Sequence, residues 1–108
     1  MKKNAKIYVT GHSGMLGSAM MRRLEADGYT NVITRTHKEL NLTRQADVEA
    51  FFEKEQPEYV FHIAAKTGGV MLNKQYPVDY LSEGTLIALN VLNAAYTYGA
   101  KGVVYVSS

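Results

Sequence analysis

The sequence contains no cysteine and no tryptophan, and only two of its 108 residues are proline. Without cysteine the chain has no disulfide framework, no thiolate metal site and no cysteine nucleophile. The charge is nearly balanced, since 12 basic and 10 acidic residues leave a net charge of +2. The basic residues form no stripe with interleaved aromatic residues, so the pattern does not favour a nucleic-acid partner.

Long apolar segments are also absent. No run approaches the roughly 20 residues that a membrane-spanning helix needs, and no apolar signal segment follows the basic start at Lys2 and Lys3. We therefore expect a cytoplasmic protein with no membrane partner. The three histidines His12, His37 and His62 lie in separate segments and predict no metal site. The length suits one domain.

Short β-branched and aromatic runs alternate with longer segments of helical spacing. The short runs predict strands at residues 6–10, 31–35, 59–65 and 102–108. The longer segments predict helices at residues 15–27, 43–55 and 78–98, the second with Thr43 as its N-cap. On the last helix, one apolar face is marked by Leu81, Leu86, Leu89, Leu92 and Ala95.

This alternation predicts an α/β fold with a parallel sheet and right-handed crossovers. The expected architecture is a Rossmann-like doubly wound sheet with strand order 3-2-1-4, truncated after the fourth strand. Residues 1–108 would form the N-terminal part of one such dinucleotide-binding domain.

Three glycines lie where the first strand passes into the first helix: Gly11, Gly14 and Gly17. We expect Gly11 to permit a tight turn, Gly14 to let a pyrophosphate approach the backbone, and Gly17 to allow close packing. The N–H groups at the start of the helix then favour a diphosphate. The alternative is a plain strand–helix connection in which the glycines are incidental.

The end of the second strand favours NADP(H) over NAD(H). Most sites that select NAD place an Asp or Glu there, to accept a hydrogen bond from the ribose, whereas this chain has Arg35, Thr36, His37 and Lys38. Cationic side chains at this point can pair with a 2′-phosphate. The alternative is that Arg35 and Lys38 are ordinary surface residues.

Four segments carry a more specific resemblance: GHSGMLGSA at 11–19, ELNL at 39–42, AAKTGG at 64–69 and YPVD at 76–79. Together they resemble the N-terminal portion of the GDP-L-fucose synthases. That family belongs to the extended short-chain dehydrogenases/reductases of the NAD-dependent epimerase/dehydratase superfamily. The similarity runs over nearly all of the chain.

The resemblance implies a parent enzyme that epimerises GDP-4-keto-6-deoxy-mannose at C3 and C5 and then reduces its C4 ketone with NADPH. It implies a homodimeric parent, a GDP-sugar substrate and a substrate domain absent from this chain. A catalytic serine is implied at the end of the fourth strand, with Ser108 the better match and Ser107 the alternative. The expected cofactor-binding residues are Gly11, Ser13, Gly14, Met15, Leu16, Gly17, Arg35, His37, Lys38, Asn41, Leu42, Ala64, Ala65 and Lys66.

The chain also departs from that family. Many bacterial relatives carry arginine at the positions of Ser13 and His37, and the superfamily usually has asparagine at that of Gly84. No tyrosine is followed by a lysine four residues later, so the catalytic Tyr-x-x-x-Lys pair is absent and we expect no catalysis by this chain alone.

Two other functions stay open: another sugar-nucleotide 4-epimerase or 4,6-dehydratase of the superfamily, or a non-catalytic nucleotide-binding module. A Tyr-x-x-x-Lys motif about 30 residues beyond Ser108 in the reading frame would indicate an enzyme. A stop codon would indicate the module.

Overall fold

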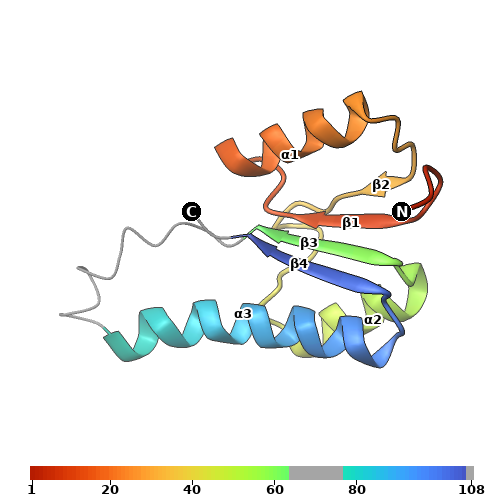
Figure 1. The fold of residues 1–108 in the computed structure, drawn as a ribbon. Helices are drawn as coiled ribbons and strands as arrows, with labels where there is room; N and C mark the ends of the chain where they lie inside the picture. The colour runs from red at the N-terminus through yellow and green to blue at the C-terminus, as the bar shows by residue number, and fades with distance from the viewer. Residues whose placement is uncertain (64–76, 107–108) are drawn as a thin grey trace.

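A four-stranded parallel sheet lies between one helix on one face and two helices on the other (Figure 1). The computed structural model describes residues 1–63 and 77–106, with the side chains of 1–63 and 86–106. Its elements in chain order are β1 (Ile7–Thr10), α1 (Met15–Ala26), β2 (Val32–Ile33), α2 (Gln45–Glu55), β3 (Tyr59–Ile63), α3 (Pro77–Thr97) and β4 (Gly102–Val106). Within this part of the chain, no helix combines the length and apolarity needed to cross a membrane.

The predicted Rossmann-like class is confirmed, but the predicted strand order is wrong. The order is β2-β1-β3-β4, so β3 lies beside β1 rather than outside β2, and β4 lies outside β3. The cause is the placement of the first two helices, since α1 covers one face of the sheet and α2 covers the other (Figure 1). Right-handed crossovers on opposite faces advance in opposite directions. The strands β2 and β3 therefore flank β1 on its two sides.

Side chains of β1 alternate between two cores. Ile7 and Val9 face α1 and pack with Leu24 and Ile63. Tyr8 points to the other face, into the cluster that α2 and α3 cover. That second cluster consists of Tyr8, Leu40, Val48, Phe52, Val60, Val91, Ala94 and Ala95. A strand buried on both faces is continuously apolar, and this makes β1 the centre of the fold.

Two helix ends agree with the sequence and one helix start does not. Gly28, at φ 90°, follows α1, and Pro57 follows α2. The N-cap of α2 is Arg44, not Thr43, and no side chain caps that helix. The Thr43 hydroxyl instead donates to Asn41 Oδ1 at 2.7 Å, because a local side-chain turn competes with capping.

The leucines of α3 mark its outer face. Leu86, Leu89 and Leu92 are all exposed, with Leu89 at 50%, whereas Val91, Ala94 and Ala95 pack on the sheet. Both faces of this helix are apolar, so the spacing of its apolar residues predicts a helix but does not show which face packs against the sheet. Leu81 lies outside the residues whose side chains are described.

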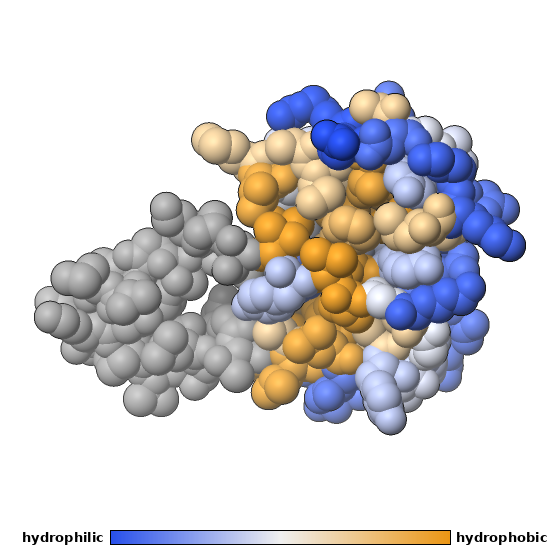
Figure 2. Space-filling view, in the orientation of Figure 1, coloured by the Kyte–Doolittle hydropathy of each residue, from blue (hydrophilic) through white to orange (hydrophobic). Residues whose placement is uncertain are grey.

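Figure 2 shows hydrophobic side chains gathered over the sheet between α1 and α3, with hydrophilic side chains around α1 and the N-terminus. In the sheet, β4 is an edge strand, and its Val104 and Tyr105 are exposed. An apolar edge strand is a surface that other chain segments can cover.

Candidate cofactor-binding site

The loop from β1 to α1 depends on two of its three glycines for its shape. Gly11 has φ 66°, and a Cβ there would lie 2.9 Å from the carbonyl oxygen of Ile63. A Cβ on Gly17 would overlap the carbonyl of Gly11. Gly14 is different, because among the described residues a Cβ there would meet only the Gly11 oxygen, at 3.8 Å. The loop therefore packs closely against Ile63 and against itself, and the described part of the chain leaves open space in front of Gly14.

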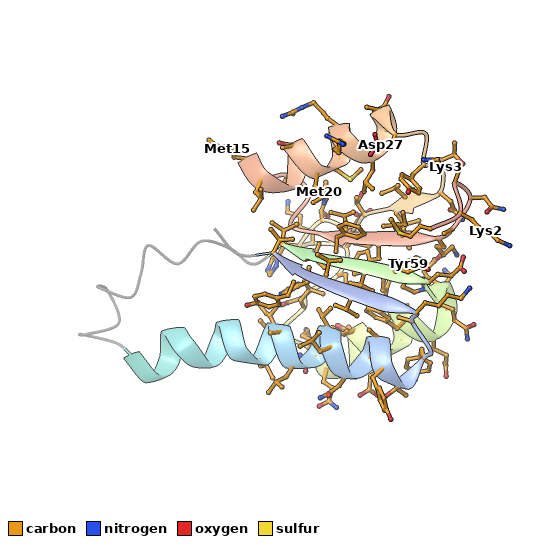
Figure 3. The ribbon with its side chains drawn as sticks, in the orientation of Figure 1. Lys2, Lys3, Met15, Met20, Asp27 and Tyr59 are labelled. Atoms are coloured by element: carbon orange, nitrogen blue, oxygen red, sulfur yellow. The ribbon has the colours of Figure 1, made fainter. Side chains whose placement is uncertain are left out.

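The start of α1 lies beside this space, and the first N–H groups of a helix have no partner within the helix. Gly14 is the N-cap, no side chain caps the helix, and its first turn contains no acidic residue. Ser13 and Met15 are exposed, Met15 at 92%, and Met15 projects from the helix start (Figure 3). Leu16 packs into the α1 core, so only its backbone N–H is left for a ligand. Free N–H groups and the helix dipole favour an anion at this end.

A buried side-chain pair joins the ends of the two central strands directly below the loop. Thr10 Oγ1 lies 2.9 Å from His62 Nδ1, and the backbone N–H of Ile63 donates to the same oxygen at 3.0 Å. Both side chains are buried, His62 at 4% exposure. Burial lowers the pKa of His62, which favours the neutral ring. The pair fixes the end of β1 against β3, whereas the sequence analysis considered His62 only among the histidines that predict no metal site.

The glycine loop stands where the strand order reverses. The sheet continues from β1 to β2 on one side and to β3 on the other, while α1 and α3 lie on opposite faces (Figure 1). In open α/β sheets this arrangement leaves a crevice at the carboxyl ends of the strands, where ligands bind. The predicted loop residues thus lie at the position where open α/β sheets bind ligands.

The segment after β2 forms a tight turn that presents two of the predicted phosphate ligands. Thr36 N–H donates to Glu39 Oε1 at 2.8 Å, and Glu39 N–H donates to Thr36 Oγ1 at 3.2 Å. The bond from Thr36 is the main reason that the pKa of Glu39 is lowered. His37 and Lys38 are exposed in this turn. The Thr-x-x-Glu spacing is the signature of this reciprocal bonding, and the sequence reading missed it.

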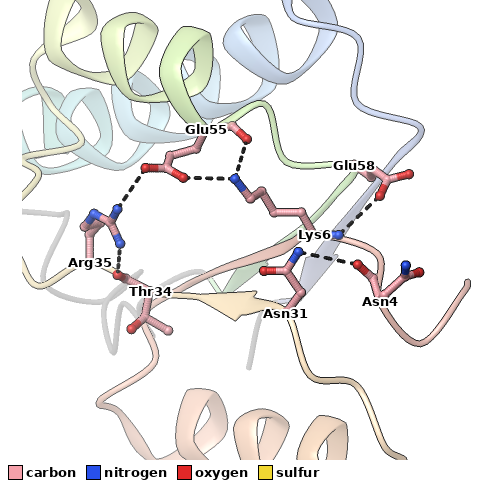
Figure 4. A network of polar contacts seen from close by, with 7 residues as sticks. All are labelled: Asn4, Lys6, Asn31, Thr34, Arg35, Glu55 and Glu58. Atoms are coloured by element: carbon pink, nitrogen blue, oxygen red, sulfur yellow. Dashed lines mark hydrogen bonds and ion pairs between the residues drawn. The ribbon is translucent and has the colours of Figure 1, made fainter.

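Arg35 lies in a different environment from its neighbours in the turn. Its guanidinium pairs with Glu55 Oε2 at 3.2 Å and donates to the Thr34 carbonyl at 2.7 Å (Figure 4). It also stacks over the ring of Phe51, with the centroid at 5.1 Å. The other oxygen of Glu55 pairs with Lys6 at 3.0 Å. A contact between Arg35 and a 2′-phosphate therefore competes with Glu55, which the sequence analysis did not single out.

Asn41 and Leu42 lie where the chain approaches α2. Asn41 Oδ1 accepts hydrogen bonds from the backbone and hydroxyl of Thr43, and the Leu42 carbonyl accepts one from Asn90 of α3. The remaining predicted site residues lie outside the described residues: Ala64, Ala65, Lys66 and Ser108, together with the alternative Ser107. Among the described residues, no group of three or more His, Asp or Glu side chains could hold a metal ion.

The sequence profile of the NAD dependent epimerase/dehydratase family matches residues 7–108. The chain belongs to this family. GDP-L-fucose synthase 1 of Arabidopsis thaliana is 48% identical over 106 residues, which are 98% of this chain and 33% of that protein. GDP-L-fucose synthase of Escherichia coli (strain K12) is 35% identical over 103 residues, 95% of this chain and 32% of that protein.

A solved structure of another member is also similar. It is MlghC, a GDP-mannoheptose C4 reductase from Campylobacter jejuni with NADP bound. The TM-score is 0.88 at 34% identity, covering 97% of this chain and 33% of that one. The similarity to GDP-L-fucose synthases expected from the sequence is confirmed. This chain of the epimerase/dehydratase family spans about a third of the length of these relatives.

Proposed function

We propose that this chain is the cofactor-binding portion of an NADPH-dependent sugar-nucleotide epimerase/reductase of the GDP-L-fucose synthase type. The observation that carries the proposal is the open space that the described residues leave in front of Gly14, beside the start of α1, which no side chain caps. A diphosphate fits this place because it needs backbone donors and room to approach them. Relatives named GDP-L-fucose synthase, at 48% and 35% identity, support the assignment.

The chain's own residues would divide the work of holding NADP(H). The backbone from Gly11 to Gly17 would bind the diphosphate, with the side chain of Ser13 at its edge. Arg35, His37 and Lys38 would face the 2′-phosphate of the adenosine ribose, and Asn41 and Leu42 would flank the adenosine. When bound, NADPH supplies the hydride for reduction of a C4 ketone. Ala64, Ala65 and Lys66 complete the proposed cofactor set, by resemblance to the family.

The catalytic part of the proposal concerns Ser108, with Ser107 as the alternative. A serine hydroxyl at the end of the fourth strand would donate a hydrogen bond to the reacting carbonyl. The tyrosine and lysine of the superfamily are absent from these 108 residues, so we propose that this chain alone does not catalyse. The cytoplasmic location also stays a prediction.

The substrate is proposed as a GDP-linked 4-keto sugar. Support for GDP comes from the relatives' names, which include GDP-L-fucose synthase and a GDP-mannoheptose C4 reductase. The second of these names favours a second candidate function, a C4 reductase for another GDP-sugar. Both candidates need the same cofactor site, so the test of that site comes first.

The decisive test is a calorimetric titration of the chain with NADPH, which measures its affinity. Gly14→Val should lower NADPH affinity by about 10-fold or more, because the added methyl groups fill the space for the diphosphate. Its fold should persist, since Gly14 has an extended backbone that any residue adopts. Ala26→Val, at the exposed far end of α1, adds comparable bulk as the matched control. Equal NADPH affinity in all three proteins would show that the loop is not the phosphate site.

A homodimer is part of the same proposal. The exposed apolar stripe of α3, made by Leu86, Leu89, Leu92 and Tyr96, supports it because such a stripe is stabilised when a second surface covers it. Sedimentation at rising concentration should show association that Leu89→Glu reduces. Sedimentation as a monomer at every concentration would contradict this part of the proposal.

A further inference from the structure

Asn90 is a buried polar residue of α3 that the sequence analysis did not assign to any role. Its exposure is 6%, and its side chain Nδ2 donates to the carbonyl oxygen of Leu42 at 2.9 Å. A buried amide is costly unless it forms hydrogen bonds. The two residues are 48 positions apart in the sequence, so this bond joins α3 to the segment that connects β2 and α2.

Hydrogen bonds within that segment set its local shape, but few side-chain hydrogen bonds join it to other elements. Thr36 and Glu39 bond each other, and Asn41 bonds Thr43. The side chain of Leu40 is buried in the core. Among the residues that the structure describes, Asn90 gives the only side-chain hydrogen bond that reaches residues 40–43 from another element. The position of the Leu42 backbone therefore depends on α3.

We propose that Asn90 is a positioning residue for the cofactor: through the Leu42 carbonyl it holds Asn41 and Leu42 in place for the adenosine half of a dinucleotide. This inference rests on the proposed function. The end of β2 is the place where dinucleotide folds hold the adenosine ribose, and residues 41–42 belong to the segment that leads from that end to α2. A shift of this backbone changes the surface offered to adenosine without moving the glycine loop.

The chain provides two matched comparisons for a test. Asn93 has the same side chain and lies on the same helix, but it is exposed, so Asn93→Ala controls for removal of an amide from α3. Val91 is fully buried beside Asn90, so Val91→Ala disturbs the packing of α3 without touching the hydrogen bond. Asn90→Gln keeps an amide donor with a longer reach and serves as the conservative variant.

The experiment measures dissociation constants for NADPH and for 2′,5′-ADP, which carries only the adenosine half. Each protein is titrated at a temperature where circular dichroism shows it folded. Asn90→Ala should raise both constants by roughly 5- to 20-fold, and Asn90→Gln should recover part of the loss. Asn93→Ala should change neither constant, and Val91→Ala should lower the unfolding midpoint while leaving both unchanged.

Three results would overturn the inference: unchanged 2′,5′-ADP binding by Asn90→Ala, equal weakening by Val91→Ala, or no recovery with Asn90→Gln. The failure of the proposed function is a different result. If the unsubstituted chain bound neither NADPH nor 2′,5′-ADP, the cofactor assignment itself would fail, and the role of Asn90 would fail with it. If that chain bound both ligands and Asn90→Ala bound them equally well, only the role of Asn90 would be wrong.

Discussion

The parallel strands all begin at one end of the sheet, called here the amino edge, and all finish at the opposite end, the carboxyl edge. Different contacts hold the strands together at these two ends. At the amino edge, Lys6, before β1, pairs with Glu55 at the end of α2, and Lys101, before β4, pairs with Glu58, which precedes β3. Figure 4 shows the contacts of Glu55 and the hydrogen bond from the backbone N–H of Lys6 to Glu58. At the carboxyl edge, the strand ends are joined by the buried Thr10–His62 pair, and glycines replace side chains. At the amino edge the charged side chains pair with one another. At the carboxyl edge no side chain caps the first N–H groups of α1.

Under the proposed function, this difference separates the contacts that stabilise the fold from the groups that would bind the cofactor. Exposed ion pairs contribute little each, but those of the amino edge join segments that lie far apart in the sequence. The carboxyl edge cannot add such side chains around Gly14 without closing the space for a ligand. Arg35 belongs to both regions, since it follows β2 and yet reaches Glu55. Substitution of Arg35 therefore affects both regions.

The largest effect is expected at the carboxyl edge, from Gly17→Ala. The added Cβ overlaps the Gly11 carbonyl, which is backbone and cannot move aside cheaply. We expect the free energy of unfolding to fall by roughly 3 kcal/mol and NADPH binding to be lost. Urea denaturation and NADPH titration measure the two effects. Gly14→Ala is the matched control, for which the change in unfolding should stay below about 1 kcal/mol; equal destabilisation by the two would contradict this account of the loop.

The next effect concerns Arg35 and its competing partner Glu55. Arg35→Met should reduce the preference for NADPH over NADH by about 10-fold, because a charge-assisted contact to the 2′-phosphate is lost. Glu55→Gln should strengthen NADPH binding by roughly 2- to 5-fold without changing NADH binding, since the guanidinium is released. Glu53→Gln makes the same change at an exposed position of α2 and should do nothing. Titration of both cofactors checks these results.

If Arg35→Met and Glu55→Gln leave the NADPH/NADH ratio unchanged, Arg35 belongs to the amino edge alone. Recognition of the 2′-phosphate would then rest on His37 and Lys38 in the turn after β2. In that outcome, the residues that stabilise the amino edge and the residues that bind the phosphate would be two separate sets.

Local patterns in the sequence predicted the parts of this molecule that depend on neighbouring residues. The turn at Gly11 and the close contact at Gly17 follow from glycine spacing after an apolar run, and the helix and strand alternation predicted the fold class. The strand order was not predictable in this way, because the hydrophobic pattern of a helix does not say which face of the sheet it covers. The outward leucines of α3, such as Leu89, show the same limit.

Contacts between distant segments were the other part that the sequence concealed. Arg35 pairs with Glu55, 20 positions away, and Asn90 bonds Leu42, 48 positions away. Nothing in the local composition distinguishes Glu55 from the other glutamates near the end of α2. The sequence thus predicted candidate phosphate ligands, Arg35 among them, but it did not predict the carboxylate of Glu55 that pairs with Arg35.

The smallest predicted effect is the pH dependence of the free energy of unfolding, to which the two edges contribute in different pH ranges. Burial lowers the pKa of His62, so the unfolded chain takes up this proton first as the pH falls through about 6.5. The unfolded state then binds more protons than the folded state, and the free energy of unfolding falls with pH until His62 is protonated in the folded chain as well. Above pH 6.5 this contribution is fully present. The change should appear in urea midpoints measured at pH 7.5 and 5.5.

The carboxylates of the amino edge respond in a lower window. Hydrogen bonds from Lys6 and Lys101 are the main causes that lower the pKa of Glu55 and of Glu58, respectively. Their stabilisation is therefore present above their ordinary value of 4.5 and lost only as the pH falls below it. His62→Gln keeps a group that can bond Thr10 but does not titrate, so it should flatten the dependence between pH 7.5 and 5.5. An unchanged slope in His62→Gln would show that the carboxyl edge does not carry this pH response.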